Sequence, residues 1–181
     1  MQEETTKQCM IGGQAFCLRS IRVEEAEQAA SMEQICFPPN EACTPVMMIQ
    51  RVQQAPDMFL VAEECESGRL VGMVCGLATS ETCFRDEFFS DASLYQPDGE
   101  NVMLLGVEVL PEYQHHGLAS RMMEQYLQRE RARGRRCVYL TCLDDKVGMY
   151  EKMGFTDLGL SASVWGGEQW HEMSCCLDGS K

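Results

Sequence analysis

The chain has 181 residues, enough for one domain with a sizeable hydrophobic core. Its 28 acidic residues outnumber the 15 Lys and Arg residues, which gives a formal net charge of −13. Such a surface excludes nucleic acid and anionic membranes as partners and favours small cationic ones, although solubility alone would also explain the charge. No apolar run reaches the roughly 18 residues of a membrane-spanning helix, so no membrane partner is expected.

The 11 cysteines indicate a reducing compartment. Their number is odd, their spacing is irregular and no signal peptide precedes them, which together predict free thiols and a cytoplasmic location. No Cys-x-x-Cys or Cys/His pair has zinc spacing, so we expect no metal site. Cys75, Cys137 and Cys142 lie in apolar, strand-like runs, where thiols act as small core residues.

The N-terminal half of the chain reads as strands and helices separated by clear breaks. Residues 1–13 are polar, then interrupted by glycine, and we expect them to be flexible. Phe37-Pro38-Pro39 ends the first predicted helix, and Thr44 followed by Pro45 begins the second. Residues 80–100 are polar and predict a loop with room for one short helix. The hydrophobic pattern predicts a strand over 14–22, helices over 23–36 and 44–52, and strands over 58–64 and 70–79.

The segment from residue 101 to residue 133 organises the rest of the chain. Residues 101–110 (NVMLLGVEVL) are mostly apolar and predict a buried strand, while apolar residues at helical spacing up to Gly134 predict an amphipathic helix. Between them, residues 114–119 (QHHGLA) form a tight turn into the helix N-terminus. Free amides and the helix dipole favour an anion there, and the small Gly117 and Ala119 leave room for phosphate oxygens.

The C-terminal part supplies the remaining elements of the sheet. The pattern predicts a strand over 136–142, a helix over 144–153 that stops at Gly154, and strands over 155–164 and 169–177. This element order predicts an α/β fold whose sheet contains strands of mixed direction.

Two motifs resemble those of a known family. The pattern Gln114-x-x-Gly117-x-Ala119 is similar to the acyl-CoA loop of the GNAT acetyltransferases, Gln/Arg-x-x-Gly-x-Gly/Ala, and it lies between a strand and a helix as that family requires. Residues 144–155 (DDKVGMYEKMGF) resemble the family's late signature, A-x-x-F/L-Y-E-x-x-G-F. The predicted elements also follow the family's fold over almost the whole chain, so the chain is identified as a member of the GNAT family.

The resemblance implies a GNAT fold: an α/β fold with a mixed, mostly antiparallel sheet of about seven strands, splayed at the fourth and fifth strands, with helices on both faces. It implies one acetyltransferase domain over 1–181, with acetyl-CoA as co-substrate and no metal. Tyr150 matches the family's general acid, which protonates the leaving thiolate; a tyrosine of the core or helix surface is the alternative. The residues implied to bind the cofactor are Val107, Glu108, Val109, Gln114, His115, His116, Gly117, Leu118, Ala119 and Ser120.

Within the family, the chain resembles the arylalkylamine (serotonin-type) N-acetyltransferases. Their late segment, Cys-x-Asp-x-x-Val-x-x-Tyr-Glu-x-x-Gly-Phe, matches residues 142–155, and their last strand carries an aromatic residue, Glu and Cys, as residues 170–175 do here. In that branch the aromatic ring of the amine contacts a phenylalanine, a proline and the aromatic residue of the last strand. Phe37, Pro45 and Trp170 match those positions, with core packing as the alternative explanation for each.

The general base is not evident from the sequence. The animal enzymes of that branch carry histidines where this chain has Met103 and Leu105, and neither of these side chains can carry a proton. We expect Glu108 to face away from the amine and to be paired elsewhere, because it alternates with its neighbours Val107 and Val109 along the strand.

Other polar residues near the motifs also have simpler explanations than catalysis. Asp144 is expected to cap the helix that it begins, and His115 and His116 to donate hydrogen bonds in the phosphate turn or face solvent. His171 and its neighbour on the last strand point to opposite faces, so only one of them can line the pocket. Cys142 as nucleophile would imply a ping-pong route, but its apolar setting argues against a low thiol pKa.

The sequence thus predicts an acetyl-CoA-dependent N-acetyltransferase that transfers an acetyl group directly to a small primary amine, with an arylalkylamine as the leading substrate class. The alternatives are acetylation of a protein or peptide, of a polyamine or of an aminoglycoside, and a catalytically weak CoA-binding sensor. We expect a monomer or homodimer with a small-molecule amine as its partner.

Overall fold

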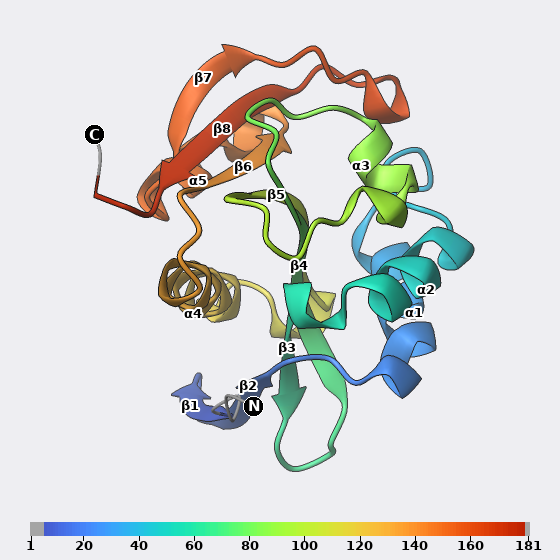
Figure 1. Ribbon diagram of the computed structural model, residues 1–181. Helices are drawn as coiled ribbons and strands as arrows, with labels where there is room; N and C mark the ends of the chain where they lie inside the picture. The colour runs from blue at the N-terminus through green and yellow to red at the C-terminus, as the bar shows by residue number, and fades with distance from the viewer. Residues whose placement is uncertain (1–5, 180–181) are drawn as a thin grey trace.

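The apolar runs of the chain assemble into an open sheet of eight strands (Figure 1). The computed structural model describes residues 6–179, within which the strand order is β1-β2-β3-β4-β5-β6-β8-β7. Every neighbouring pair is antiparallel except β5 and β6, which are parallel. The predicted α/β class and mostly antiparallel mixed sheet are therefore confirmed. The strands are β1 (Lys7–Ile11), β2 (Gln14–Arg19), β3 (Phe59–Glu64), β4 (Leu70–Thr79), β5 (Asn101–Val109), β6 (Cys137–Cys142), β7 (Thr156–Leu160) and β8 (His171–Cys176).

Helices cover both faces of the sheet. In Figure 1, α1 and α2 lie on one side of β3 and β4, and α4 lies on the other. All ten residues of β4 are buried, as expected of a central strand covered on both faces. The helices are α1 (Ala26–Cys36), α2 (Pro45–Gln54), α3 (Glu87–Ser90), α4 (Leu118–Ala132) and α5 (Val147–Lys152), with 3-10 turns η1 (Val23–Glu25), η2 (Pro56–Met58), η3 (Ala92–Leu94), η4 (Pro111–Tyr113), η5 (Asp144–Lys146) and η6 (Trp165–Gly167).

The sheet splays where β5 and β6 part. Only residues 101–103 of β5 pair with residues 137–139 of β6. Beyond that point β5 stays paired with β4 as far as Val109, whereas β6 continues beside β8. These are the fourth and fifth of the seven strands that the sequence predicts, so the predicted splay is confirmed.

A β-bulge lies at the start of the splay. Cys75 faces Gly106 and Gly76 faces Leu104, so Leu105 is an extra residue on β5 without a partner on β4. A bulge bends its strand and re-aims the side chains that follow it. Gly76 permits this geometry, because a Cβ at this position would lie 2.7 Å from the carbonyl oxygen of Met103.

The N-terminus differs from its predicted flexible state. Residues 7–11 form β1, which pairs with β2 around the turn at Gly12 and Gly13. Both glycines have positive φ, 59° and 83°, which suits a tight hairpin turn. The expected flexible segment 1–13 therefore contains an ordered strand, the eighth of the sheet, while residues 1–5 lie outside the described residues.

Other boundaries moved by a few residues. The predicted strand over 14–22 ends at Arg19, and the strand predicted over 155–164 ends at Leu160. Thr44 caps α2 as predicted: its hydroxyl accepts a hydrogen bond of 3.2 Å from the Met47 amide. Among residues 6–179, no helix combines the length and apolarity that crossing a membrane would require.

Candidate active site

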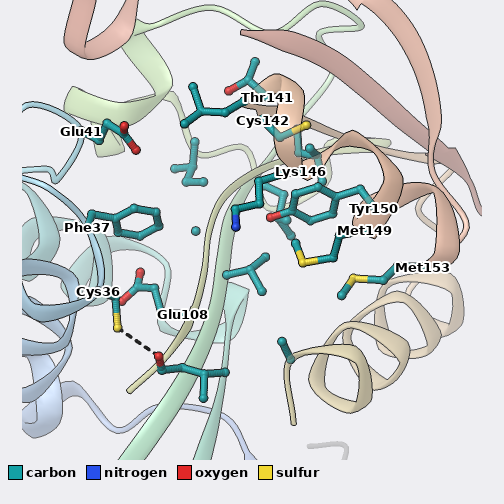
Figure 2. Close-up of a pocket in the computed structure, with 18 of the residues that line it drawn as sticks. Cys36, Phe37, Glu41, Glu108, Thr141, Cys142, Lys146, Met149, Tyr150 and Met153 are labelled. Carbon is teal, nitrogen blue, oxygen red and sulfur yellow. Dashed lines mark hydrogen bonds between the residues drawn. The ribbon is translucent and has the colours of Figure 1, made fainter. Parts of the chain in front are cut away.

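The splay between β5 and β6 opens into a cleft of about 600 Å³. Its floor is the bulged part of β5, one wall comes from α1 and the loop after it, and the other comes from β6 and α5. Figure 2 shows Cys36, Phe37 and Glu41 on one side and Lys146, Met149 and Tyr150 on the other. The cleft thus brings together segments that lie far apart in the sequence.

One end of the cleft has the geometry of an anion-binding site. The chain turns into α4 through two residues with positive φ, His115 at 65° and Gly117 at 90°. The first-turn amides of Leu118, Ala119 and Ser120 have no intrahelical acceptor, and no side chain caps them. A Cβ added to Gly117 would meet nothing within 4 Å, so the approach to these amides is open. A phosphate group fits such a helix N-terminus.

The adjoining strand edge is also free. From Leu104 to Val109, β5 has lost β6 as its neighbour, so its backbone polar groups on that side face the cleft. An extended chain containing amides can bind to such an edge as an added strand does. Gln114 holds the turn in place by donating a hydrogen bond of 2.8 Å to the carbonyl oxygen of Val109. Together the edge and the turn match a ligand with amides at one end and phosphates at the other, as in coenzyme A.

The predicted cofactor residues lie mostly along this half of the cleft. Nine of the ten line it. His116 does not; its ring lies beside Gly12, 3.8 Å from the position of a Cβ there, at the turn between β1 and β2. The chain turns sharply at His115 and Gly117, which directs this one side chain away from the cleft.

Tyr150 projects from α5 into the cleft (Figure 2). It is half-buried and packs edge-on against Phe155 with ring centroids 5.8 Å apart. Burial, with the nearby Cys142 as a smaller cause, raises the pKa of the phenol. Its hydroxyl is therefore protonated at neutral pH and available as a proton donor.

Glu108 differs from its expected position. Its side chain is 1% exposed, lines the cleft, and has no hydrogen-bond partner for either carboxylate oxygen among the described residues. Burial first, and the neighbouring Glu33 carboxylate second, raise the pKa of Glu108 well above its usual range, while Arg51 acts in the opposite direction. The expectation that Glu108 is paired elsewhere was wrong, because the packing of α1 against β5 places the Glu33 carboxyl, and no donor group, beside it.

Aromatic side chains form another part of the cleft wall. Phe37 and Trp170 both line the cleft, whereas Pro45 does not: it is the first residue of α2 and is exposed. Trp165 and Phe89 also belong to this wall and stack with ring centroids 4.8 Å apart.

Hydrogen bonds fix the two tryptophans. Trp170 donates from its indole nitrogen to the carbonyl oxygen of Trp165, at 2.9 Å, and Trp165 donates in the same way to that of Glu41, at 2.6 Å. Sequence reasoning missed Trp165 and Phe89, because both lie in loop or short-helix segments. Only the glycines after Trp165 marked it as part of a special turn.

The remaining residues considered from the sequence have other roles. Met103 is fully buried and does not line the cleft, whereas Leu105 does. His171 lies between two carboxylates, with Nδ1 and Nε2 each 3.1 Å from an oxygen of Asp157 and Asp144 respectively. Burial raises the pKa of the Cys142 thiol to about 11, which leaves it protonated and a poor nucleophile.

Charged side chains are distributed unevenly around the cleft. The charged side chains lining it are the carboxylates Glu33, Glu41 and Glu108 and the ammonium of Lys146. A cationic amine is therefore favoured on the α1 side. Within the described part of the chain, no group of three or more His, Cys, Asp or Glu residues is arranged to hold a metal ion.

Comparison with known proteins assigns this architecture. The family model described as "Acetyltransferase (GNAT) family" matches residues 24–155. Among solved structures, a GNAT-like decarboxylase, GphF, in complex with isobutyryl-CoA has a TM-score of 0.75 at 19% identity, covering 88% of this chain and 98% of the other. The NatC complex bound to Gag peptide and CoA gives 0.68 at 14% identity, covering 89% and 98%.

A third structure is a spermidine N-acetyltransferase chimera from Vibrio cholerae and hSSAT, with a TM-score of 0.64 at 14% identity, covering 90% of this chain and 96% of the other. At such identities the three structures show a shared fold and no more. The family model spans most of the chain and includes the cofactor turn, Tyr150 and the cleft-lining part of β5. The chain therefore belongs to the acetyltransferase (GNAT) family.

Proposed function

We propose that this protein transfers the acetyl group of acetyl-CoA directly to a small primary amine, with an arylalkylamine as the leading acceptor. The observation that carries the proposal is the two-sided cleft. Backbone amides and an open strand edge line one side, and a buried, unpaired carboxylate and an aromatic wall line the other, with Tyr150 nearby. Two substrates can thus lie in one cleft, as direct transfer requires.

The cofactor half explains how acetyl-CoA would be held. The amides of Leu118, Ala119 and Ser120 would bind the diphosphate, and the free edge of β5 would bind the amides of the pantetheine arm. When bound, acetyl-CoA supplies an acyl group activated as a thioester. The backbone supplies most of these contacts, so the site depends on the turn geometry more than on particular side chains.

Tyr150 supplies the proton that the leaving group needs. In the reaction a C–N bond forms, the C–S bond breaks, and the sulfur leaves as a thiolate that must be protonated. A phenol with a raised pKa remains protonated until a stronger base appears beside it. Tyr150 would transfer its proton to the sulfur and regain one from solvent.

The acceptor half favours a cation with an aromatic group. Phe37, Trp165 and Trp170 offer flat apolar surfaces, and the three carboxylates attract an ammonium group. Polyamines and peptide N-termini share the charge but not the ring. The aromatic wall is therefore the reason to rank an arylalkylamine above spermidine or a peptide.

A thiol-release assay over an amine library tests the proposal. With saturating acetyl-CoA, tryptamine and phenylethylamine should give higher kcat/KM values than spermidine or an N-terminal peptide. Preference for spermidine or the peptide would replace the arylalkylamine by that class. If the protein binds coenzyme A but releases no thiol with any amine, it is a CoA-binding sensor and the catalytic proposal fails.

A further inference from the structure

A buried carboxyl pair lies beneath the acceptor side of the cleft. Glu33 on α1 and Glu108 on β5 are 6% and 1% exposed, and both line the cleft. Glu33 accepts a hydrogen bond of 2.9 Å from the Cys43 amide, whereas neither oxygen of Glu108 receives a hydrogen bond from a donor group among the described residues, and only the Glu33 carboxyl lies beside it. Buried carboxylates are normally satisfied, so the two free oxygens of Glu108 require an explanation.

The pair has one permanent counter-charge. Arg51 on α2 is 2% exposed and always protonated, and it is held by the carbonyl oxygen of Phe89, at 2.7 Å from Nη2. Two carboxylates and one guanidinium leave a net charge of −1 in a site shielded from water. Burying an uncompensated charge is costly, so the cluster favours taking up one more positive charge.

The other ionisable groups around the pair do not supply that charge. Burial raises the pKa values of Cys36 and Cys43 to about 12 and raises that of Cys75 as well, so these thiols are neutral. Glu112 on η4 is exposed and paired with Arg69. The groups that face the pair are thus Cys36 from α1, Cys43 from the loop after it, Arg51 from α2, Cys75 from β4 and, more distantly, Glu112 from η4.

The carboxylate of Glu108 is also sterically confined. A Cβ at position 106 would lie 2.7 Å from its Oε1, so the glycine there leaves the space that the carboxylate occupies. Figure 2 shows Glu108 beside Cys36 and below Phe37, on the acceptor side of the cleft. A group bound against Phe37 would therefore meet Glu108 first.

From this geometry we propose that Glu33, Glu108 and Arg51 form a site for a single positive charge, filled by a proton in the free enzyme and by the acceptor's ammonium group in the complex. On binding, the ammonium displaces the proton to solvent. During transfer, the ammonium group first gives one proton to Glu108, which frees the nitrogen lone pair to form the C–N bond. As the C–S bond breaks, Tyr150 gives its proton to the sulfur, and the second proton of the nitrogen passes to solvent. Glu33 acts through Glu108 as a positioning residue, because its charge increases the proton affinity of its neighbour.

This inference rests on the proposed function. The carboxyl pair would take the place of the histidines that the animal arylalkylamine enzymes carry where this chain has Met103 and Leu105. A carboxylate with ordinary proton affinity is a poor base for an alkylamine. A carboxylate whose pKa is raised by burial and by a neighbouring carboxylate is a better one. The pair would provide on the α1 side the proton acceptor that β5 lacks at those two positions.

The first test needs no acceptor. Carbon-13 NMR of labelled Glu carboxyl groups, in protein loaded with coenzyme A, should show one carboxyl titrating well above the ordinary range of glutamate. That resonance should be absent from Glu108→Gln, and in Glu33→Gln it should titrate at lower pH. Gln at position 33 can still accept the Cys43 hydrogen bond, so the loop stays anchored. If every Glu carboxyl titrates in the ordinary range, the inference is overturned, whatever the enzyme acetylates.

The second test measures proton release and turnover with tryptamine. Calorimetry in buffers of different ionisation enthalpy should detect proton release, of up to one proton per site, when tryptamine binds to the coenzyme A complex, and none for Glu108→Gln. At pH 7, Glu108→Gln should lose about 100-fold in kcat/KM. Its rate should then rise with pH as free amine accumulates, while Glu33→Gln should move the acid limb of the profile to lower pH.

Glu27→Gln is the matched control, because Glu27 lies on α1 but is exposed and away from the cleft. It should behave as wild type in both tests. Wild-type turnover by Glu108→Gln at pH 7 would overturn the inference. Absence of thiol release from the wild type with tryptamine, spermidine and peptide would overturn the proposed function instead, and the NMR titration would still decide whether the pair holds a proton.

Discussion

The two halves of the cleft present different kinds of chemical group to a ligand. The α4 half presents backbone groups: first-turn amides, an open strand edge and a turn with positive φ at His115 and Gly117. The α1 half presents side chains: the carboxylates of Glu33 and Glu108 and the aromatic wall around Trp170. Backbone recognition tolerates many side chains and suits a constant co-substrate. Side-chain recognition varies easily and suits an acceptor that defines the individual enzyme.

Tyr150 should produce the largest effect, because it acts on the chemistry that both halves serve. In Tyr150→Phe we expect kcat to fall about 100-fold, with the affinity for coenzyme A unchanged, since the phenol protonates the thiolate and does not hold the cofactor. Steady-state thiol release and calorimetry measure the two quantities. Tyr139→Phe, outside the cleft on β6, is the control and should retain wild-type kcat. An unchanged kcat in Tyr150→Phe would remove the acid from the mechanism.

Trp170 tests the side-chain half. Trp170→Ala should raise KM for tryptamine about 30-fold, corresponding to roughly 2 kcal/mol of lost apolar contact, and should raise that for spermidine much less. Pro45→Ala sharpens the comparison, because Pro45 matches the branch pattern in sequence yet does not line the cleft. It should leave both KM values unchanged. Equal increases for both amines in Trp170→Ala would contradict the aromatic pocket.

Glycine substitutions at the two ends of α4 test the half of the cleft that presents backbone groups. Gly117 and Gly134 have φ of 90° and 81°, and a Cβ at either would meet nothing within 4 Å. Each Gly→Ala change should therefore cost about 1 kcal/mol of unfolding free energy through backbone strain. Only Gly117→Ala should also weaken coenzyme A binding, by roughly fivefold, because only that end of α4 lines the cleft where we propose that the diphosphate binds. Equal coenzyme A affinity in the two variants would place the diphosphate elsewhere.

His171 should give the smallest effect and lies outside both halves. Its contacts with Asp157 first, and Asp144 second, raise its pKa above the ordinary value of histidine. A raised folded-state pKa means that this stabilisation is fully present below about pH 6.5, the unfolded value, and is lost as the pH rises through the folded value. Urea unfolding of the wild type against His171→Asn should show a difference that shrinks as the pH increases. A difference that grows with pH would contradict the ion pairs.

The local elements were largely readable from the sequence. Apolar periodicity indicated all the strands except β1, and Thr44 with Pro45 marked the start of α2 as the structure has it. The motif around Gly117 marked the turn into α4, because the residues that form it are six consecutive ones. Strand β1 was missed since its signal is weak: its residues are mostly exposed, and only pairing with β2 orders them.

The acceptor side was not readable in the same way. Glu33, Arg51 and Glu108 come from α1, α2 and β5, and nothing in their spacing indicates that they share a buried site. The bulge at Leu105 shifts the alternation of β5 by one residue, so one regular pattern cannot assign the side chains before and after it to faces of the sheet. Trp165 and Phe89 likewise meet because η6 and α3, far apart in the sequence, pack together.

The sequence by itself therefore determined the class of fold, the turn at Gly117 into α4 and the position of Tyr150 on α5, because each of these depends on residues close together in the chain. The tertiary structure alone decided which carboxylates and aromatic rings line the cleft. Their proximity arises from sheet order, a bulge and helix packing, and the proton affinity of Glu108 arises from the burial and neighbouring charge that this packing imposes.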